Sequence, residues 1–183
     1  MTVEHVILFA GPMGAGKTTA ISSISDIPVV ATEAVNNDRE HNAKATTTVA
    51  LDYGQIALPE GEVVRLYGIP GQERFEFMWK ILEARAEGLI ILLDNDAQNP
   101  IADMDHFLDR FRTMCRRRTV VVGVTRTDVA STYSIDSYYH RLRERHQHIP
   151  IFEVDARDRA QILVLLTTLV VMVQMHMNET GAD

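Results

Sequence analysis

Short apolar runs alternate with longer segments of mixed polarity along the chain, and this alternation predicts the secondary structure. Three runs rich in β-branched residues predict strands that are buried on both faces of a parallel sheet, at residues 6–10, 89–93 and 120–124. A further strand is predicted at residues 151–154. The intervening segments predict helices at residues 17–24, 73–87, 101–114, 135–145 and 158–177. Strands that alternate with helices in this way are typical of βαβ units.

A hairpin is predicted in the first third of the chain. Residues 47–58 and 62–67 have the composition of strands, and Pro59-Glu60-Gly61 provides the turn between them. Residues 32–46 are polar and lack periodicity, which indicates a functional or mobile loop. We therefore predict one α/β domain over residues 1–183. It is a three-layer sandwich with a mostly parallel six-stranded sheet and one antiparallel edge strand.

A glycine-rich loop joins the first predicted strand to the first predicted helix. Residues 11–18 read G-P-M-G-A-G-K-T and fit the pattern G-x-x-x-x-G-K-[ST]. The glycines let successive backbone N–H groups converge on phosphates, and the helix N-terminus adds partial positive charge. In this pattern Lys17 reaches the β- and γ-phosphates, and the Thr18 hydroxyl binds Mg²⁺. An ordinary glycine-rich turn is the alternative, but the strand-loop-helix context favours a nucleoside triphosphate site.

Composition and charge exclude several classes of function. The net charge of −7 argues against a nucleic-acid partner, because such partners require a basic surface. The single cysteine, Cys115, excludes a disulfide framework and indicates a reducing compartment. The sequence shows no secretory leader and no lipidation motif, so we expect a cytoplasmic protein without an intrinsic membrane anchor. The apolar stretch at residues 162–175 is too short to span a membrane and predicts a buried core element.

The order of motifs resembles that of the Ras-like small GTPases over nearly the whole chain. After the phosphate loop, the matching segments are T-T-T-V-A-L-D-Y at residues 46–53, G-I-P-G-Q-E-R-F at 68–75, T-R-T-D at 125–128 and V-D-A at 154–156. The segments at residues 46–53 and 68–75 are similar to those of a prokaryotic branch, the MglA gliding-motility type and its relatives. Proteins of that branch are often paired with Roadblock/light-chain proteins. The resemblance implies a P-loop NTPase fold of the Ras-like type.

The resemblance also implies roles for single residues. Thr48 would contact Mg²⁺ and the γ-phosphate, the Gly71 N–H would contact the γ-phosphate, and Gln72 would orient the attacking water as the catalytic residue. Asp128 would accept hydrogen bonds from guanine N1 and N2, and the Ala156 N–H would donate to guanine O6. The implied nucleotide-binding residues are Gly11, Met13, Gly14, Ala15, Gly16, Lys17, Thr18, Thr19, Thr48, Gly71, Thr125, Arg126, Asp128, Asp155 and Ala156, with Thr18 and Thr48 as metal ligands.

Three positions depart from the pattern of that family. Gly68 replaces an aspartate that holds a water on Mg²⁺, so we expect weaker metal affinity without loss of nucleotide binding. Asp52 or Asp94 could substitute, although Asp52 would equally suit a solvent-facing strand position and Asp94 a turn cap. Thr125 and Arg126 replace an asparagine and a lysine beside the base. The aspartate of that motif is retained, so guanine is favoured while adenine stays open.

The expected activity is slow hydrolysis of GTP to GDP. Arg39, Lys44 and Arg74 are each expected to be solvated charges, so no residue is assigned as an arginine finger and a partner would be needed for speed. We expect a Mg²⁺-dependent guanine-nucleotide switch, with loops 32–48 and 68–80 as switches, that regulates a partner protein. The Roadblock/light-chain type is the partner that the resemblance implies. The alternatives are a weak or inert nucleotide-binding scaffold and a nucleoside or nucleotide kinase.

Two further features of the sequence each allow two interpretations. The basic run Arg116-Arg117-Arg118 lies at a predicted helix end, where the helix dipole explains it, although a docking patch for an acidic partner is the alternative. The closing helix is rich in Val, Leu and Met, which predicts a core element, and part of it would also suit a partner interface.

Overall fold

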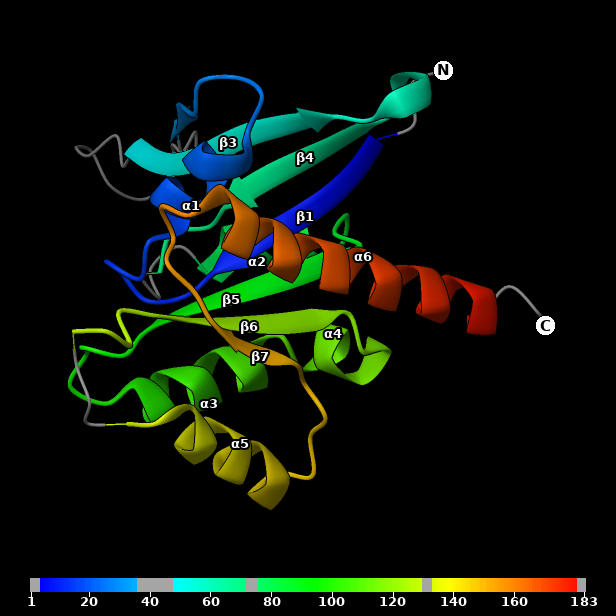
Figure 1. Ribbon diagram of the computed structural model, residues 1–183. Coiled ribbons are helices and arrows are strands. Elements are labelled where there is room, and N and C mark those ends of the chain that lie inside the picture. Colours follow the sequence, from blue (N-terminus) through cyan, green and yellow to red (C-terminus); the bar gives the residue numbers. More distant parts are fainter. Residues whose placement is uncertain (1–3, 36–47, 72–75, 130–132, 181–183) are drawn as a thin grey trace, which may run out of the picture.

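A seven-stranded sheet forms the centre of the computed structural model, which describes residues 4–35, 48–71, 76–129 and 133–180 (Figure 1). The strand order is β2-β3-β4-β1-β5-β6-β7. The strands are β1 (Glu4–Ala10), β2 (Val30–Val35), β3 (Thr48–Ala57), β4 (Val63–Gly68), β5 (Gly88–Asp94), β6 (Val120–Thr125) and β7 (Ile151–Glu153). Strand β3 runs antiparallel to β2 and β4, and the other neighbours in the sheet are parallel.

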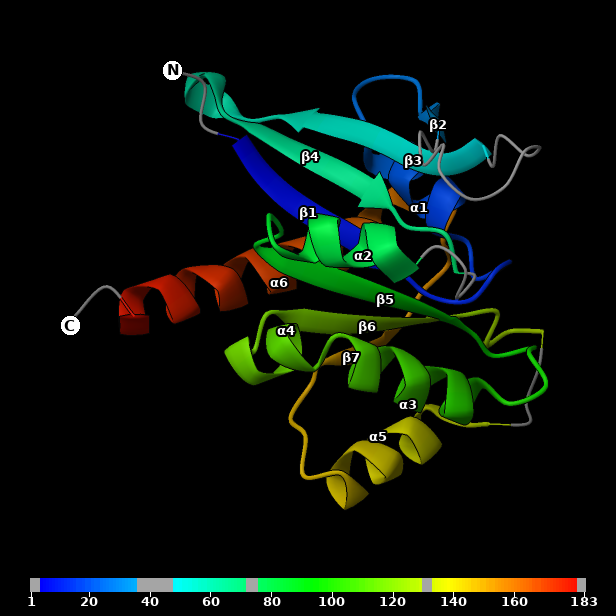
Figure 2. The ribbon, with the colours of Figure 1, turned by 180° about the vertical axis from the view of Figure 1, so that it is seen from behind.

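Helices cover both faces of the sheet, as the two opposite views show (Figures 1 and 2). One face carries α1 (Lys17–Ile24) and α6 (Arg159–Thr180), and the other carries α2 (Glu76–Glu83), α3 (Pro100–Arg110), α4 (Arg112–Arg117) and α5 (Ile135–Glu144). Because side chains alternate along a strand, β1 contributes to both cores. Ile7 and Phe9 pack on the α1 and α6 side, and Leu8 and Ala10 pack on the other. The α/β P-loop fold class is thus confirmed.

The sheet has one strand more than the sequence predicts. Strand β2 occupies residues that we expected to be loop, and it pairs antiparallel with β3 from Val30↔Tyr53 to Val35↔Thr48. An edge strand needs no continuous apolar run, because one of its sides has no strand partner. The predicted hairpin is confirmed as β3 and β4, joined by the short helix η1 (Pro59–Gly61). The antiparallel strand β3 is therefore second from the edge, and β2 is the edge itself.

The helix predicted at residues 101–114 is interrupted in the structure. Helix α3 ends at Arg110 and α4 starts at Arg112, with Phe111 between them at φ −99° and ψ 36°. The Phe111 side chain is fully buried and stacks on Trp79 with ring centroids 6.0 Å apart. An apolar periodicity continues across such a break, so it does not mark the bend.

Helix α6 is longer and more exposed than a core element. Its apolar residues Ile162, Leu165 and Leu169 pack on the sheet and are fully buried. By length and composition the segment Arg159–Glu179 could cross a membrane: an 18-residue window of it has a mean hydropathy of 1.8, and 28% of that window is buried. The expectation that this stretch is a buried core element therefore holds for one face of the helix and is wrong for the rest.

Candidate nucleotide-binding site

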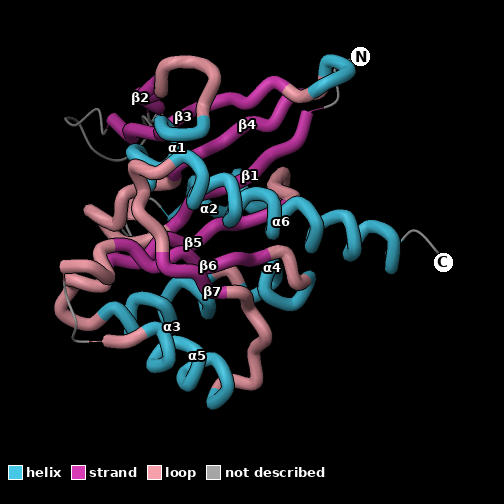
Figure 3. Tube along the Cα trace, in the orientation of Figure 1, coloured by secondary structure: helices cyan, strands magenta, loops and turns pink. Residues whose placement is uncertain are grey.

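The loops after β1, β5, β6 and β7 gather at one edge of the sheet (Figure 3). These strands are parallel, so their carboxyl ends meet there, which is where open α/β sheets bind ligands. The phosphate loop lies between β1 and α1, as the sequence predicts.

The phosphate loop has a backbone that only glycine allows. Gly11, Gly14 and Gly16 have φ angles of 141°, 86° and 92°. A Cβ atom at Gly11 would lie 2.0 Å from the carbonyl oxygen of Leu92, so a larger residue would displace the loop or β5. Gly16 is the N-cap of α1 and supplies no side-chain cap. The first N–H groups of α1 therefore have no capping side chain, which suits an anion.

Lys17 lies back across this loop. Its ammonium donates to the carbonyl oxygens of Gly11 at 2.8 Å and Pro12 at 2.7 Å. The residue is only 9% exposed. Burial lowers the pKa of Lys17 to about 8, and the Asp52 carboxylate opposes part of that shift. A buried cation held by two carbonyl dipoles, without a direct carboxylate partner, is suited to receive phosphate oxygens.

Asp52 lies beside the phosphate loop and does not simply face solvent. The Thr18 hydroxyl donates to its Oδ2 at 2.5 Å. Asp52 on β3 stands directly opposite Gly68 on β4, where a Cβ atom at position 68 would lie 3.0 Å from the Asp52 Cβ. The carboxylate of Asp52 thus fills the space beside Gly68. Of the two interpretations that the sequence left open for Asp52, this position supports the substitute for the missing aspartate.

Thr18 and Asp52 together fit a Mg²⁺ site. Mg²⁺ is bound in nucleotide sites by one or two protein oxygens together with phosphates and waters. Because the Thr18 hydroxyl donates its proton to Asp52, its lone pairs remain available to a cation. Within the described part of the chain there is no group of three or more His, Cys, Asp or Glu side chains that could hold a metal without a nucleotide.

Asp94 caps a turn, which is the alternative role that the sequence allowed for it. Its Oδ1 accepts from the Asp96 N–H at 3.0 Å, which caps the turn after β5, and its Oδ2 pairs with the Arg126 guanidinium. Arg126 also donates to the carbonyl oxygen of Gly14 at 3.3 Å. Arg126, which has a left-handed backbone with φ 57°, therefore joins the loop after β6 to the phosphate loop.

Thr125 retains the loop-joining contact expected of an asparagine at this position. Its buried hydroxyl lies 3.0 Å from the carbonyl oxygen of Leu93 and 3.3 Å from that of Ala15. The first of these carbonyls is on β5 and the second is in the phosphate loop. The replacement shortens the side chain without losing the connection between the two loops.

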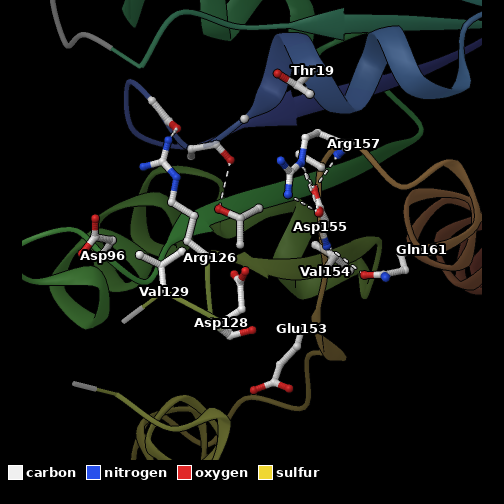
Figure 4. Close-up of a pocket in the computed structure, with 16 residues that line it drawn as sticks. Thr19, Asp96, Arg126, Asp128, Val129, Glu153, Val154, Asp155, Arg157 and Gln161 are labelled. Carbon is white, nitrogen blue, oxygen red and sulfur yellow. Dashed lines mark hydrogen bonds and ion pairs between the residues drawn. The ribbon is translucent and has the colours of Figure 1, made fainter. Parts of the chain in front are cut away.

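A cavity of about 840 Å³ opens between these loops. The residues that line it include nine that the sequence analysis predicted to bind nucleotide: Gly14, Ala15, Gly16, Thr19, Thr125, Arg126, Asp128, Asp155 and Ala156. Figure 4 shows Arg126 on one side and Asp155 with Arg157 on the other, with Asp128 between them. A Cβ atom at Gly16 would lie 2.9 Å from the Ala156 Cβ, so the phosphate loop is in contact with the loop that follows β7. The cavity is thus continuous with the phosphate loop and large enough for a nucleoside.

Several other residues that line the cavity were not predicted from the sequence, among them Asp96, Glu153, Arg157 and Gln161. The guanidinium of Arg157 binds the Asp155 carboxylate at 2.7 to 3.2 Å, and this side-chain hydrogen bonding, with the Arg157 N–H, lowers the pKa of Asp155 to about 2. The Gln161 side chain accepts from the Asp155 N–H at 2.8 Å. Asp155 therefore orders the loop after β7 through its contacts with Arg157 and Gln161, and no sequence pattern indicated these partners.

The turn after β4 is held against the phosphate loop. The Ile69 N–H donates to the Phe9 carbonyl at 2.9 Å, and a Cβ atom at Gly71 would lie 2.5 Å from the Gly11 carbonyl oxygen. The buried Trp79 indole donates to the Pro70 carbonyl at 3.0 Å. Gly71 is thus held beside the phosphate loop through the two residues that precede it. Gln72, the predicted catalytic residue, lies outside the described residues.

Six predicted nucleotide-binding residues do not line the cavity. Gly11, Lys17, Thr18 and Gly71 belong to the phosphate loop or lie beside it, whereas Met13 and Thr48 are elsewhere. Met13 is on the outside of the phosphate loop and is 78% exposed. Thr48 is the first residue of β3, paired with Val35, and its side chain lies outside the described part of the chain. Along the strand its backbone is about 13 Å from that of Asp52, since each residue advances about 3.3 Å. The structure therefore does not bring Thr48 to Thr18.

The contact between Trp79 and Pro70 allows a test of how the turn is held. Replacing Trp79 with Phe should lower the free energy of unfolding by about 1–3 kcal/mol, because the Pro70 carbonyl loses its donor while most of the ring packing is kept. Urea unfolding measures the change. A matched Tyr139→Phe variant removes a hydroxyl hydrogen bond from the half-exposed α5 surface and should cost less. An unchanged midpoint for Trp79→Phe would contradict the anchoring role.

Comparison with known families agrees with this geometry. The sequence model of one family, described as conserved hypothetical ATP binding protein, matches residues 28–181. The chain belongs to this ATP-binding family. The match covers the turn after β4 and the cavity loops after β6 and β7, whereas the phosphate loop precedes it. No curated protein matches the chain. This member of the ATP-binding family is therefore a nucleotide-binding P-loop protein.

Nucleotide affinity of this family member should fall as the pH rises above about 8. Lys17 loses its proton near that pH, while bound phosphates favour the protonated form, so binding at higher pH must take up a proton. The affinity then falls by up to about tenfold for each pH unit. Titration of GDP between pH 7 and pH 9 measures the slope. A Lys17→Arg variant that still binds should show a flatter profile, because arginine stays charged; a flat wild-type profile would contradict the assignment.

Proposed function

We propose that the protein is a guanine-nucleotide switch that hydrolyses GTP to GDP slowly with Mg²⁺. The observation that carries the proposal is the hydrogen bond from Thr18 to Asp52 beside Gly68. A carboxylate beside this threonine suits Mg²⁺ bound to the phosphates of a nucleotide, and Mg²⁺ is the metal on which hydrolysis of GTP depends. The carboxylate that the Ras-like pattern places at position 68 is here supplied from the neighbouring strand.

The residues present divide the work between binding and hydrolysis. Lys17 and the first N–H groups of α1 bind the phosphates, and Thr18 with Asp52 would hold Mg²⁺. When bound, Mg²⁺ neutralises charge that develops on the phosphate oxygens. Gly71 lies beside the phosphate loop, where its N–H would donate to the γ-phosphate, and Gln72 would orient the attacking water.

Guanine is the base that the cavity chemistry favours, although the family description names ATP. The carboxylate of Asp128 has two oxygens that only accept hydrogen bonds. Guanine offers two adjacent donors, N1–H and the N2 amino group, whereas adenine offers one donor beside an acceptor. Asp128 lines the cavity, and among the described residues its side chain has no hydrogen bond or ion pair, although its charge acts on the nearby Arg157 guanidinium. A carboxylate in this state would repel the N1 acceptor of adenine and bind guanine.

The switch itself involves residues 32–48 and 68–80. Thr48 would have to move from its register in β3 to reach Thr18 and the γ-phosphate, so the GTP state differs from the described conformation at the β2 and β3 pair. The turn at positions 68–71 is joined to α2 through Trp79, so movement there is transmitted to that helix. Ile81 on α2 is 63% exposed and would be part of the surface that a regulatory partner reads. We infer that the partner is a Roadblock/light-chain protein and that the two proteins meet in the cytoplasm.

Single-turnover hydrolysis tests the proposal. The wild-type protein loaded with GTP should form GDP at a rate that depends on Mg²⁺, and Gln72→Leu should slow it by about a hundredfold or more. The variant should retain its affinity for GDP, because Gln72 contacts only the reacting water. No hydrolysis in the wild type, or equal rates in the two proteins, would leave a nucleotide-binding scaffold as the function. Transfer of phosphate to a nucleoside or nucleotide acceptor would indicate a kinase instead.

A further inference from the structure

A groove of about 590 Å³ lies at the edge of the sheet that is opposite to the nucleotide cavity. Arg117 and Arg118 precede β6 and Pro150 precedes β7, so the groove is at the amino ends of these strands, whereas the cavity is at their carboxyl ends. The C-terminal half of α6 forms its long wall. Figure 1 shows this half of α6 extending beyond the sheet.

The wall formed by α6 carries an exposed apolar stripe, beside which the polar residues Thr167, Thr168, His176 and Glu179 also line the groove. Val171, Met172 and Met175 line the groove, and Val171 and Met175 are 49% and 60% exposed. Met175 follows Met172 by three residues and Val171 by four, so it lies next to both on one side of the helix. Methionine side chains adapt their shape to the surface that they meet. An apolar stripe of this kind in solvent is typical of an interaction surface.

The opposite rim of the groove is cationic. The side chains of Arg117 and Arg118 are exposed, and no carboxylate pairs with either of them in the described ranges of the chain. By contrast, Arg141 on the α5 surface is bound by Asp105 and Glu144. The dipole of α4 explains little of this charge, because the helix has only 6 residues. On a chain of net charge −7, this rim is a local site for negative charge.

We propose that this groove binds an acidic amphipathic helix of a partner protein. Apolar side chains of that helix would pack on Val171, Met172 and Met175, while its carboxylates would pair with Arg117 and Arg118. The proposal does not depend on which nucleotide the protein binds. Because the groove is remote from the phosphate loop, the partner would bind with equal affinity in the GDP-bound and GTP-bound forms.

Two other occupants fit the groove less well. A flat anionic membrane does not match a concave surface, and α6 carries no Lys or Arg after Arg159, whereas helices that lie on membranes are rich in both. A second copy of α6 would cover the apolar stripe but would bring only one carboxylate of the helix end, Glu179, to the rim. An acidic helix matches both the stripe and the charge.

A designed peptide tests the proposal directly on the full chain. The probe is a fluorescently labelled helix of about 16 residues, roughly four turns, with leucines along one face and glutamates on both flanks. A second peptide has lysine in place of every glutamate. The acidic peptide should bind, and Arg117→Glu with Arg118→Glu should weaken it by about tenfold or more, while the lysine peptide should bind this variant better than wild type. Circular dichroism confirms that the variant folds.

The controls separate this site from general charge effects. Arg85→Glu changes an exposed arginine outside the groove and should leave binding of the acidic peptide unchanged, whereas Met175→Asp should weaken it. Equal binding of the two peptides to wild type, or no effect of the double substitution, would overturn the proposal. A third outcome would also overturn it. If the acidic peptide does not bind, and the double substitution abolishes binding to phosphatidylglycerol vesicles, a membrane is the occupant of the groove.

Discussion

Replacing Asp52 with Ala is expected to raise the Mg²⁺ concentration needed for GTP hydrolysis by about 10–100-fold, the usual cost of losing a residue that supports a metal ligand. The reason is local. The Thr18 hydroxyl donates to Asp52, so without the carboxylate it loses both its orientation and the negative charge beside the metal. The rate of GTP hydrolysis, measured over a series of Mg²⁺ concentrations, gives the shift.

A carboxylate exchange makes this prediction sharper. Gly68→Asp alone should not improve metal affinity, because the new side chain would meet the Asp52 side chain and the Ile21 methyl group at about 3.0 Å. Asp52→Gly combined with Gly68→Asp moves the carboxylate across the strand pair and should recover part of the lost Mg²⁺ dependence. Asp136→Asn, on the exposed start of α5, is the matched control. If Asp52→Ala hydrolyses GTP at the wild-type Mg²⁺ requirement, Asp52 does not support the metal.

Replacing Lys17 with Ala is expected to abolish measurable nucleotide binding. The Lys17 ammonium lies within the phosphate loop, where it would donate to the β- and γ-phosphate oxygens. Charge-assisted hydrogen bonds contribute about 1.5–3 kcal/mol each, so the loss of two such bonds to phosphate weakens binding by about a hundredfold or more. Isothermal titration with GDP and GTP measures the change. Lys80→Ala removes an exposed lysine of α2 and should bind normally.

The Lys17 variant needs one further measurement, because this side chain also holds the loop. Its thermal midpoint should stay near that of the wild type, since burying an ammonium is itself costly and removing it offsets the lost contacts with Gly11 and Pro12. A folded variant with unchanged affinity would show that the phosphates do not contact Lys17. The phosphate loop would then be an ordinary strand-to-helix turn.

The sequence predicts the central strands and the phosphate loop well, for a physical reason. Strands such as Leu89 to Leu93 are buried on both faces, so their residues form short apolar runs without alternation. The phosphate loop combines glycines with the lysine and threonine of one known chemistry, and the structure gives each glycine a positive φ. Local patterns were sufficient in both cases.

The errors arise where structure depends on residues that are distant in sequence. Strand β2 is stabilised by pairing with β3, and its short sequence, V-A-T-E-A-V, lacks the continuous run of large aliphatic residues that marks the central strands. The break at Phe111 follows from the packing of that ring against Trp79. The position of Asp52 depends on the register of β3 with β4, which no single-sequence pattern reveals. The partner of Asp155, Arg157, is two residues away, but the sequence did not show that both line the cavity.

The central claim is that Asp128 in the cavity selects guanine, and a competition titration tests it most directly. A fluorescent GDP analogue bound with Mg²⁺ is displaced by GDP, GTP, ADP or ATP. We expect only the guanine nucleotides to compete, and we expect Asp128→Asn to reduce their advantage. Equal competition by ADP and ATP would contradict the account and would make the protein an ATP-binding member of its family in the literal sense.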